Sequence, residues 1–384
     1  MPDNKFDFDT PIDRKNTDSI KWNKYQGQNI FPVWVADMDF VSPKAVLKAL
    51  HDRVDHGVFG YTHPPDELIR ILIERMKNHY NWQVSAEWFV WLPGLVTGLN
   101  VCCRATGKED DDVLTTTPIY PPFLSAPGFS SRQLITAPLK QSGDKWTFDF
   151  NKFEEAITER TRLFLLCSPY NPVGRVFAKE ELLELSSICR KHDIVICSDE
   201  IHCDLILDSH KNHMPTASLN QDVEKQVITL MAPSKTYNLP GLGCSFAIIA
   251  DPDLRHRFRK AMAGIVPHVN TLGYQAALAA YRDGDEWLAA LISYLRGNRD
   301  IVMKTVNQIP GLKMTPVEAT YLAWINARAM GLENPAAFFE QAGVGLSDGT
   351  EFGFPGYLRL NFACPRQELI RCLEKMDNAV MKLF

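Results

Sequence analysis

The sequence lacks any long apolar run, and nothing in it approaches the roughly 18 consecutive apolar residues that a membrane-spanning helix needs. Its first residues, MPDNKFDFDTPIDRK, are polar and acidic and contain no apolar stretch of the kind found in a secretory signal peptide. An excess of positive charge is missing too, because 41 Lys and Arg stand against 46 Asp and Glu, which gives a net charge of −5. We therefore expect no membrane segment, no signal peptide and no nucleic-acid partner.

Paired cysteine motifs are also absent. The nine cysteines are an odd number without any C-x-x-C spacing, and Cys167, Cys197 and Cys244 lie within apolar runs. This distribution indicates reduced, mostly buried thiols in a cytoplasmic protein, and it supports neither a disulfide framework nor a metal site. Because no G-x-G-x-x-G follows an apolar run, a nicotinamide-dependent dehydrogenase is not expected either.

What the sequence does contain is an alternation of helical and strand patterns. Apolar residues have helical spacing in segments such as 65–80 and 178–192. Short apolar runs bounded by Gly, Pro, Ser or Asp, a composition typical of strands covered on both faces, occur at 88–92, 112–117, 162–168, 193–199, 226–231 and 244–250. We therefore predict a mostly parallel α/β sheet between about residues 85 and 250, followed by helical sequence and a smaller α+β unit.

Several predicted strands are followed by residues that can carry chemistry, although each also has an ordinary structural explanation. PGLVTGLN after 88–92 is a glycine turn that opens a helix, where free N–H groups suit a phosphate, but most such turns bind nothing. Tyr120, Asn171 and Asp199 follow or end the next runs; a packed loop tyrosine, a turn asparagine and a helix cap are the structural alternatives. Lys235, in APSKTYNLPGLG, follows the run 226–231, and its alternative is a surface lysine on a loop.

These residues share one position, since each lies at or just after the carboxyl end of a predicted strand. Ligands bind at the carboxyl ends of the strands in open parallel sheets, and here a phosphate-binding turn, an aromatic ring, an asparagine, an aspartate and a lysine follow successive strands. Such groups match a phosphorylated pyridine aldehyde, since they supply phosphate binding, ring stacking, partners for the ring oxygen and ring nitrogen, and an amine for a Schiff base. The pattern therefore predicts a site for pyridoxal 5'-phosphate (PLP).

The sequence resembles fold-type I PLP-dependent enzymes of the class I/II aminotransferase superfamily, and within them the MalY/PatB-type cystathionine β-lyases, which are carbon–sulfur (C–S) lyases. The resemblance extends over essentially the whole chain and rests on PVWVADMDF (32–40), GYTHP (60–64), SPYNPVGRV (168–176), CSDEIHCDL (197–205), PSKTYNLPGL (233–242) and LRLNFACPR (358–366). It implies a large domain with a seven-stranded, mostly parallel sheet covered by helices, and a smaller α+β domain. We expect an N-terminal segment (1–47) that joins the small domain, a large PLP-binding domain (48–284) and a small C-terminal domain (285–384).

The same resemblance implies roles for individual residues. Lys235 would form the Schiff base with PLP, Asp199 would bind the pyridine nitrogen, and Tyr120 would stack on the ring. The remaining roles are Asn171 and His202 at the ring oxygen, the backbone amides of Leu95 and Val96 with Ser234 at the phosphate, Arg359 on the substrate α-carboxylate, and Tyr61 on the phosphate of the partner chain in a homodimer. A planar, bidentate guanidinium suits the carboxylate better than a lysine would.

Two positions depart from the pattern typical of aminotransferases. Gly243 stands where those enzymes place an arginine on the phosphate, and His202 stands where they place a tyrosine on the ring oxygen. Both departures resemble the lyase branch, and they leave undecided which residues contact the phosphate. We therefore expect α,β-elimination from a sulfur amino acid, an L-cysteine S-conjugate such as cystathionine, to pyruvate, ammonia and a thiol. The alternatives are an aminotransferase with the same residues and, less favoured, a PLP-fold protein that senses a ligand and regulates a partner.

Overall fold

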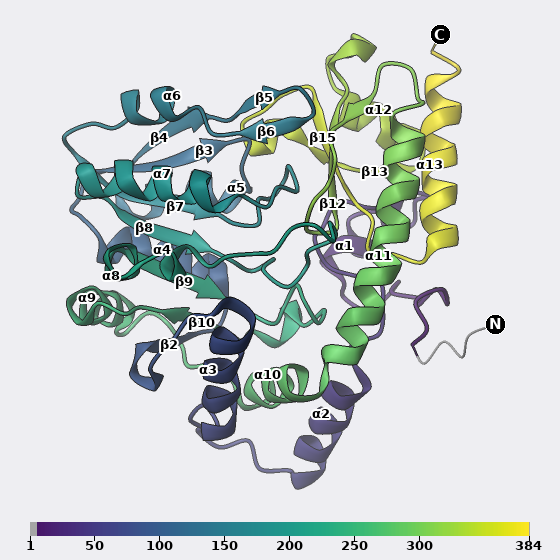
Figure 1. Cartoon of the computed structure of the whole chain (residues 1–384). Coiled ribbons are helices and arrows are strands. Elements are labelled where there is room, and N and C mark those ends of the chain that lie inside the picture. Colours follow the sequence, from purple (N-terminus) through teal and green to yellow (C-terminus); the bar gives the residue numbers. More distant parts are fainter. Residues whose placement is uncertain (1–5, 384) are drawn as a thin grey trace.

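The computed structural model describes residues 6–383, and its centre is a seven-stranded sheet with helices packed around it (Figure 1). The strand order is β2-β10-β9-β8-β7-β3-β4, and neighbouring strands are parallel except in the two pairs that involve β10. The strands are β2 (Phe89–Leu92), β3 (Asp112–Thr117), β4 (Gln133–Pro138), β7 (Thr161–Cys167), β8 (Val195–Asp199), β9 (Val227–Met231) and β10 (Ser245–Ile248). All six apolar runs predicted to be strands lie in this sheet, so the predicted α/β fold is confirmed.

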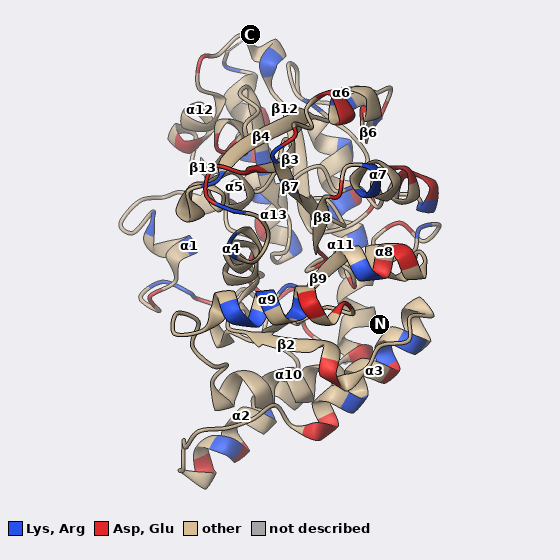
Figure 2. Cartoon of the chain, turned by 90° about the vertical axis from the view of Figure 1, so that its left-hand side faces the viewer, with Lys and Arg blue, Asp and Glu red and all other residues tan. Residues whose placement is uncertain are grey.

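The interior strands are apolar on both faces because both faces are covered. Every residue of β3, β9 and β10 is buried, whereas the edge strand β4 exposes most of its side chains. Charged residues gather on the surrounding helices, and the strands are mostly free of them (Figure 2). The helices around this sheet are α2 (Lys44–His56), α3 (Asp66–Tyr80), α4 (Leu95–Ala105), α5 (Pro121–Ser125), α6 (Phe150–Glu155), α7 (Lys179–Lys191), α8 (Gln221–Gln226), α9 (Pro252–Met262) and α10 (Thr271–Asp283), and a hairpin of β5 (Lys140–Ser142) and β6 (Lys145–Thr147) lies beyond β4.

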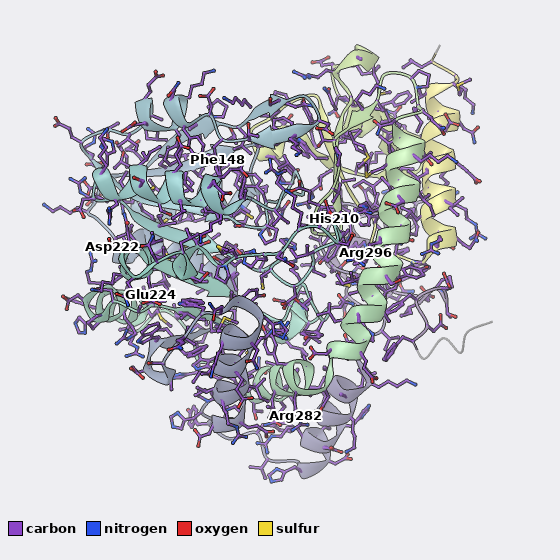
Figure 3. All side chains as sticks on the ribbon, in the orientation of Figure 1. Phe148, His210, Asp222, Glu224, Arg282 and Arg296 are labelled. Atoms are coloured by element: carbon purple, nitrogen blue, oxygen red, sulfur yellow. The ribbon has the colours of Figure 1, made fainter. Side chains whose placement is uncertain are left out.

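The long helix α11 (Asp285–Val306) leads from α10 to a second, smaller sheet of order β11-β12-β15-β14 (Figure 1). Arg296 on α11, labelled in Figure 3, donates a hydrogen bond from Nε to the carbonyl oxygen of Leu207 at 2.8 Å and so ties the helix to the loop after β8. The elements of this part are β11 (Lys313–Met314), β12 (Leu322–Asn326), α12 (Pro335–Gln341), β13 (Val344–Gly345), β14 (Ser347–Asp348), β15 (Tyr357–Asn361) and α13 (Arg366–Val380).

In the described part of the N-terminal segment, before α2, the regular structure consists of α1 (Ile20–Asn23) and β1 (Phe31–Pro32). Strand β1 pairs in parallel with β13 in a separate two-stranded sheet, which places this segment beside the C-terminal part of the chain although more than 300 residues separate the two strands in sequence. None of the helices within residues 6–383 combines the length and the apolar character needed to cross a bilayer.

Candidate active site

A cavity of about 230 Å³ lies at the edge of the large sheet where β2, β3, β7, β8 and β9 end. Most of the predicted site residues line it: Leu95, Val96, Tyr120, Asn171, Asp199, His202, Ser234 and Lys235. The parallel topology brings them together, because the carboxyl ends of parallel strands meet at one edge. A larger groove of about 530 Å³ lies between the N-terminal segment and α13, and it is lined by none of the predicted residues.

Lys235 lies in the loop after β9, and its Nζ donates a hydrogen bond to the carbonyl oxygen of Ala36 at 2.5 Å. Burial of the amine lowers its pKa from 10.5 to about 8; the charge of Asp37 opposes this shift and that of Arg359 adds to it. The side chain keeps some exposure through the cavity that it lines. An amine of this pKa is partly neutral near pH 8 and can act there as a nucleophile or a base.

Asp199 is the last residue of β8 and is 5% exposed. Burial raises the pKa of its carboxyl group from 3.8 to about 7, and the backbone N–H of Ile201, at 3.1 Å from Oδ1, only partly offsets this. Within residues 6–383, no lysine, arginine or histidine forms a salt bridge with Asp199. A buried carboxylate of this kind at a cavity wall is a binding position for a cation.

Arg359 on β15 lies next to the cavity, where it contacts the lining residue Asn171, although it does not line the cavity itself. Its Nη1 donates to Oδ1 of Asn171 at 3.2 Å, its Nη2 donates to the carbonyl oxygen of Trp34 at 2.7 Å, and the guanidinium carbon lies 4.7 Å from the ring centre of Phe352. Burial lowers its pKa to about 10. Its Nε is buried and has no hydrogen-bond partner among the described residues, so the guanidinium retains a donor for an anion.

His202 and Tyr120 complete the side walls. Burial lowers the pKa of His202 to about 3, so its imidazole is neutral, and its Nδ1 has no hydrogen-bond partner in the part of the chain that is described. Tyr120 precedes α5 and is only partly buried, so one part of its side chain faces the cavity.

The N-terminus of α4 forms the remaining wall. Gly94 precedes the helix, no side chain caps it, and a Cβ at Gly94 would meet nothing within 4 Å. Gly94, Leu95, Val96 and Thr97 line the cavity, so the first N–H groups of α4 lie at its wall and, together with the helix dipole, favour an anion. Gly243 has φ +58° and its added Cβ would lie 3.1 Å from the carbonyl oxygen of Pro93, so both the backbone conformation and the close contact disfavour a larger residue here.

Like Arg359, Tyr61 is absent from the lining of this cavity. It belongs to the connection between α2 and α3, and its side chain is fully exposed. The described residues of a single chain therefore do not bring Tyr61 to the other predicted residues.

Ala36, in the segment 34–40, also lines the cavity, and the carbonyl groups of this segment accept hydrogen bonds from side chains of distant parts of the chain. These hydrogen bonds run from Arg359 to Trp34, from Asn361 to Val35 and Asp37, from Lys235 and Tyr321 to Ala36, and from Asn238 to Met38 and Phe40. A backbone carbonyl carries no side-chain signal in a sequence, so Ala36 could not be identified. Thr97, in the first turn of α4 and also a lining residue, could have been identified from its place in PGLVTGLN.

Comparison with known proteins places this geometry in a family. A family model described as aminotransferase class I and II matches residues 34–376. The chain is 36% identical to cystathionine beta-lyase PatB of Bacillus subtilis over 389 residues, which cover 97% of this chain and 99% of PatB.

Two solved structures are similar over nearly their whole length. OvoB is 44% identical with a TM-score of 0.96, and the match covers 98% of this chain and 99% of OvoB. Cystalysin from Treponema denticola, described as containing a pyridoxal 5'-phosphate cofactor, is 34% identical with a TM-score of 0.94, over 99% of this chain and 100% of cystalysin. The predicted resemblance is confirmed, and this chain belongs to the aminotransferase class I and II family.

Proposed function

We propose that this protein is a PLP-dependent C–S lyase that catalyses α,β-elimination from an L-cysteine S-conjugate, with cystathionine as the reference substrate. The products are pyruvate, ammonia and a thiol. The relative PatB is named a cystathionine beta-lyase, and cystalysin is described with PLP, which supports both the reaction and the cofactor. The observation that carries the proposal is the presence, in one cavity, of the Lys235 amine with its lowered pKa and of the buried Asp199 carboxylate, which forms no salt bridge within residues 6–383.

The groups around the cavity fit PLP part by part. The uncapped N-terminus of α4 suits the phosphate, and the buried carboxyl group of Asp199 suits a protonated pyridine nitrogen. We propose these contacts: the amides of Leu95 and Val96 with Ser234 for the phosphate, Asp199 for the ring nitrogen, Asn171 and His202 for the ring oxygen, Tyr120 for stacking on the ring, and Lys235 for covalent attachment through Nζ.

When bound, PLP supplies an electron sink for the negative charge that is left on the substrate Cα. The free amine of Lys235 takes the Cα proton at Nζ, and its lowered pKa keeps a useful share of it neutral at mildly alkaline pH. Arg359 binds the α-carboxylate, and its enclosure by Asn171 and Phe352 keeps water away from that ion pair. A neutral His202 adds a hydrogen-bonding group without adding charge.

We also propose a cytoplasmic homodimer in which Tyr61 of the partner subunit completes the phosphate site. The full exposure of Tyr61 supports this, as do the exposed apolar side chains of Val58 (61%) and Phe59 (57%) beside it. All nine cysteines are free and buried, which agrees with a reducing compartment. The pairing of β1 with β13 supports the proposed domain division, in which residues 1–47 join the small domain (285–384) and residues 48–284 form the large one.

The decisive experiment measures products from the PLP-loaded protein with cystathionine, cystine or cysteine as the sole substrate. Pyruvate and thiol should accumulate over many turnovers without an added keto acid. If product stops at one equivalent per site and resumes only with a keto acid, transamination is the main activity. If no substrate turns over while a partner protein still binds, the regulatory alternative replaces the lyase.

A further inference from the structure

The carbonyl oxygen of Ala36 accepts two hydrogen bonds in the wall of the cavity. One comes from Lys235 Nζ at 2.5 Å and the other from the hydroxyl group of Tyr321 at 3.1 Å. A carbonyl oxygen has two lone pairs, so these two donors saturate it. Lys235 and Tyr321 are therefore coupled through a single acceptor.

Tyr321 is held in this place by an unusual backbone conformation. Thr320, the residue before it, has φ +72°, a value that a β-branched residue rarely adopts. The surroundings fix this conformation, because the Thr320 N–H donates to the carbonyl oxygen of Leu205 at 2.8 Å and Thr320 Oγ1 accepts from the Leu322 N–H at 3.1 Å. The phenol of Tyr321, 1% exposed, is directed at Ala36 as a result.

We propose that Tyr321 is a positioning residue whose hydroxyl group holds the Ala36 carbonyl so that this carbonyl can release and retake the Lys235 amine. Whenever Nζ turns toward the cavity, Tyr321 still satisfies the buried carbonyl, which would otherwise lose its only donor at a cost of about 1–3 kcal/mol. When Nζ returns, it donates one of its N–H groups to the second lone pair of the Ala36 carbonyl oxygen. This hydrogen bond orients the lone pair on Nζ itself. The inference rests on the proposed role of Lys235.

The charges that face Lys235 do not change when the Tyr321 hydroxyl group is removed. They are Asp37 in the segment 34–40, Asp199 on β8 and Arg359 on β15, and the neutral His202 lies beside them. Burial raises the pKa of Tyr321 well above 10, so this phenol is also uncharged. A change in the pKa of Lys235 in Tyr321→Phe therefore reports the change at the Ala36 carbonyl.

The sign of that change follows from the competition for one oxygen. An ammonium group donates more strongly than a neutral amine, so an acceptor that is free for Lys235 alone favours the protonated form. Tyr321→Phe should therefore raise the pKa of Lys235 by about half to one pH unit, which corresponds to one neutral hydrogen bond. The acidic limb of the kcat profile for pyruvate formation should move upward with it.

The test uses the cofactor-free protein and measures the acetylation of Lys235 by acetic anhydride against pH, with the modified peptide quantified by mass spectrometry. Tyr170→Phe is the matched control, because this buried tyrosine donates to another backbone carbonyl, that of Thr116, at 2.9 Å. Near-UV circular dichroism of each variant establishes that it is folded.

An upward shift in Tyr321→Phe that is absent from Tyr170→Phe supports the proposal. An unchanged or lowered pKa of Lys235 in Tyr321→Phe, or an equal shift in the control, overturns it. Because labelling needs no cofactor, the result is independent of turnover: loss of pyruvate formation by the native protein removes the proposed function, whereas an unchanged labelling pKa removes only the role of Tyr321.

Discussion

Replacing Asp199 by asparagine should stabilise the cofactor-free protein at alkaline pH, although it should abolish most of its activity. Burial raises the pKa of this carboxyl group from 3.8 to about 7, so the folded protein binds more protons than the unfolded chain between these values. The free energy of unfolding therefore falls as pH rises through this window, and the penalty is complete once the carboxyl group is ionised in both states. At about 1.36 kcal/mol per pKa unit, the penalty is about 2 kcal/mol at pH 5 and about 4 kcal/mol at pH 8.

Asparagine has the shape of the protonated acid and carries no such penalty. Urea unfolding of the cofactor-free proteins measures this difference. The free energy of unfolding of Asp199→Asn, relative to that of the native protein, should be about 2 kcal/mol higher at pH 8 than at pH 5. The exposed Asp52, which forms a surface ion pair with Lys48, supplies the control variant Asp52→Asn, because such a pair contributes little to the free energy of unfolding.

Addition of PLP should reverse which of the two proteins has the higher free energy of unfolding. The positive charge of a pyridinium beside Asp199 would offset the desolvation penalty of the buried carboxylate. The native protein should therefore gain more stability from PLP than Asp199→Asn does. If Asp199→Asn and native protein respond equally to pH without PLP, the carboxylate is not as poorly solvated as the structure indicates. If the variant also eliminates at a near-native rate, Asp199 does not hold the ring nitrogen.

Three further predictions follow from the same geometry. Borohydride should fix PLP to the Lys235 peptide, and Lys235→Ala should give no reducible adduct; an adduct on another lysine would reassign the attachment site. Arg359→Ala should lower kcat/KM for the amino-acid substrate by at least about 30-fold while PLP affinity changes little, since a buried charge pair is broken; equal efficiency of the native protein on substrate amides and acids would contradict this. Mixed dimers of Lys235→Ala and Tyr61→Phe chains should recover activity, up to half the native value per dimer; activity equal to the mean of the two parents would place Tyr61 outside the shared site.

The sequence was sufficient for the parts of the fold that are governed by burial. The runs that became β3, β8 and β9 are apolar because both of their faces are covered, so their composition identifies them. Strand β4 was missed because, at the edge of the sheet, it exposes most of its side chains and carries no apolar run. The short strands β5 and β6 were missed for the same reason.

The candidate site also contains residues that the sequence alone could identify and residues that it could not. Asn171, Asp199 and Lys235 could be grouped from the sequence alone, because parallel topology brings the ends of successive strands to one edge. Arg359 could not, since its 3.2 Å contact with Asn171 joins two sheets across 188 residues, and only the resemblance to a family pointed to it. The roles of the Ala36 carbonyl and of Tyr321 depend on three-dimensional packing and left no pattern in the sequence.

The segment 34–40 has a consequence for the order in which a newly made chain can become active. Its carbonyl groups are held by Arg359 and Asn361, which leave the ribosome more than 300 residues after Trp34 and Val35 do. The large sheet is complete in sequence by Ile248, so that part can fold during synthesis while this wall of the cavity stays open. We expect ribosome-bound chains that end before β15 to bind PLP weakly, with firm capture of the cofactor delayed until translation is almost finished.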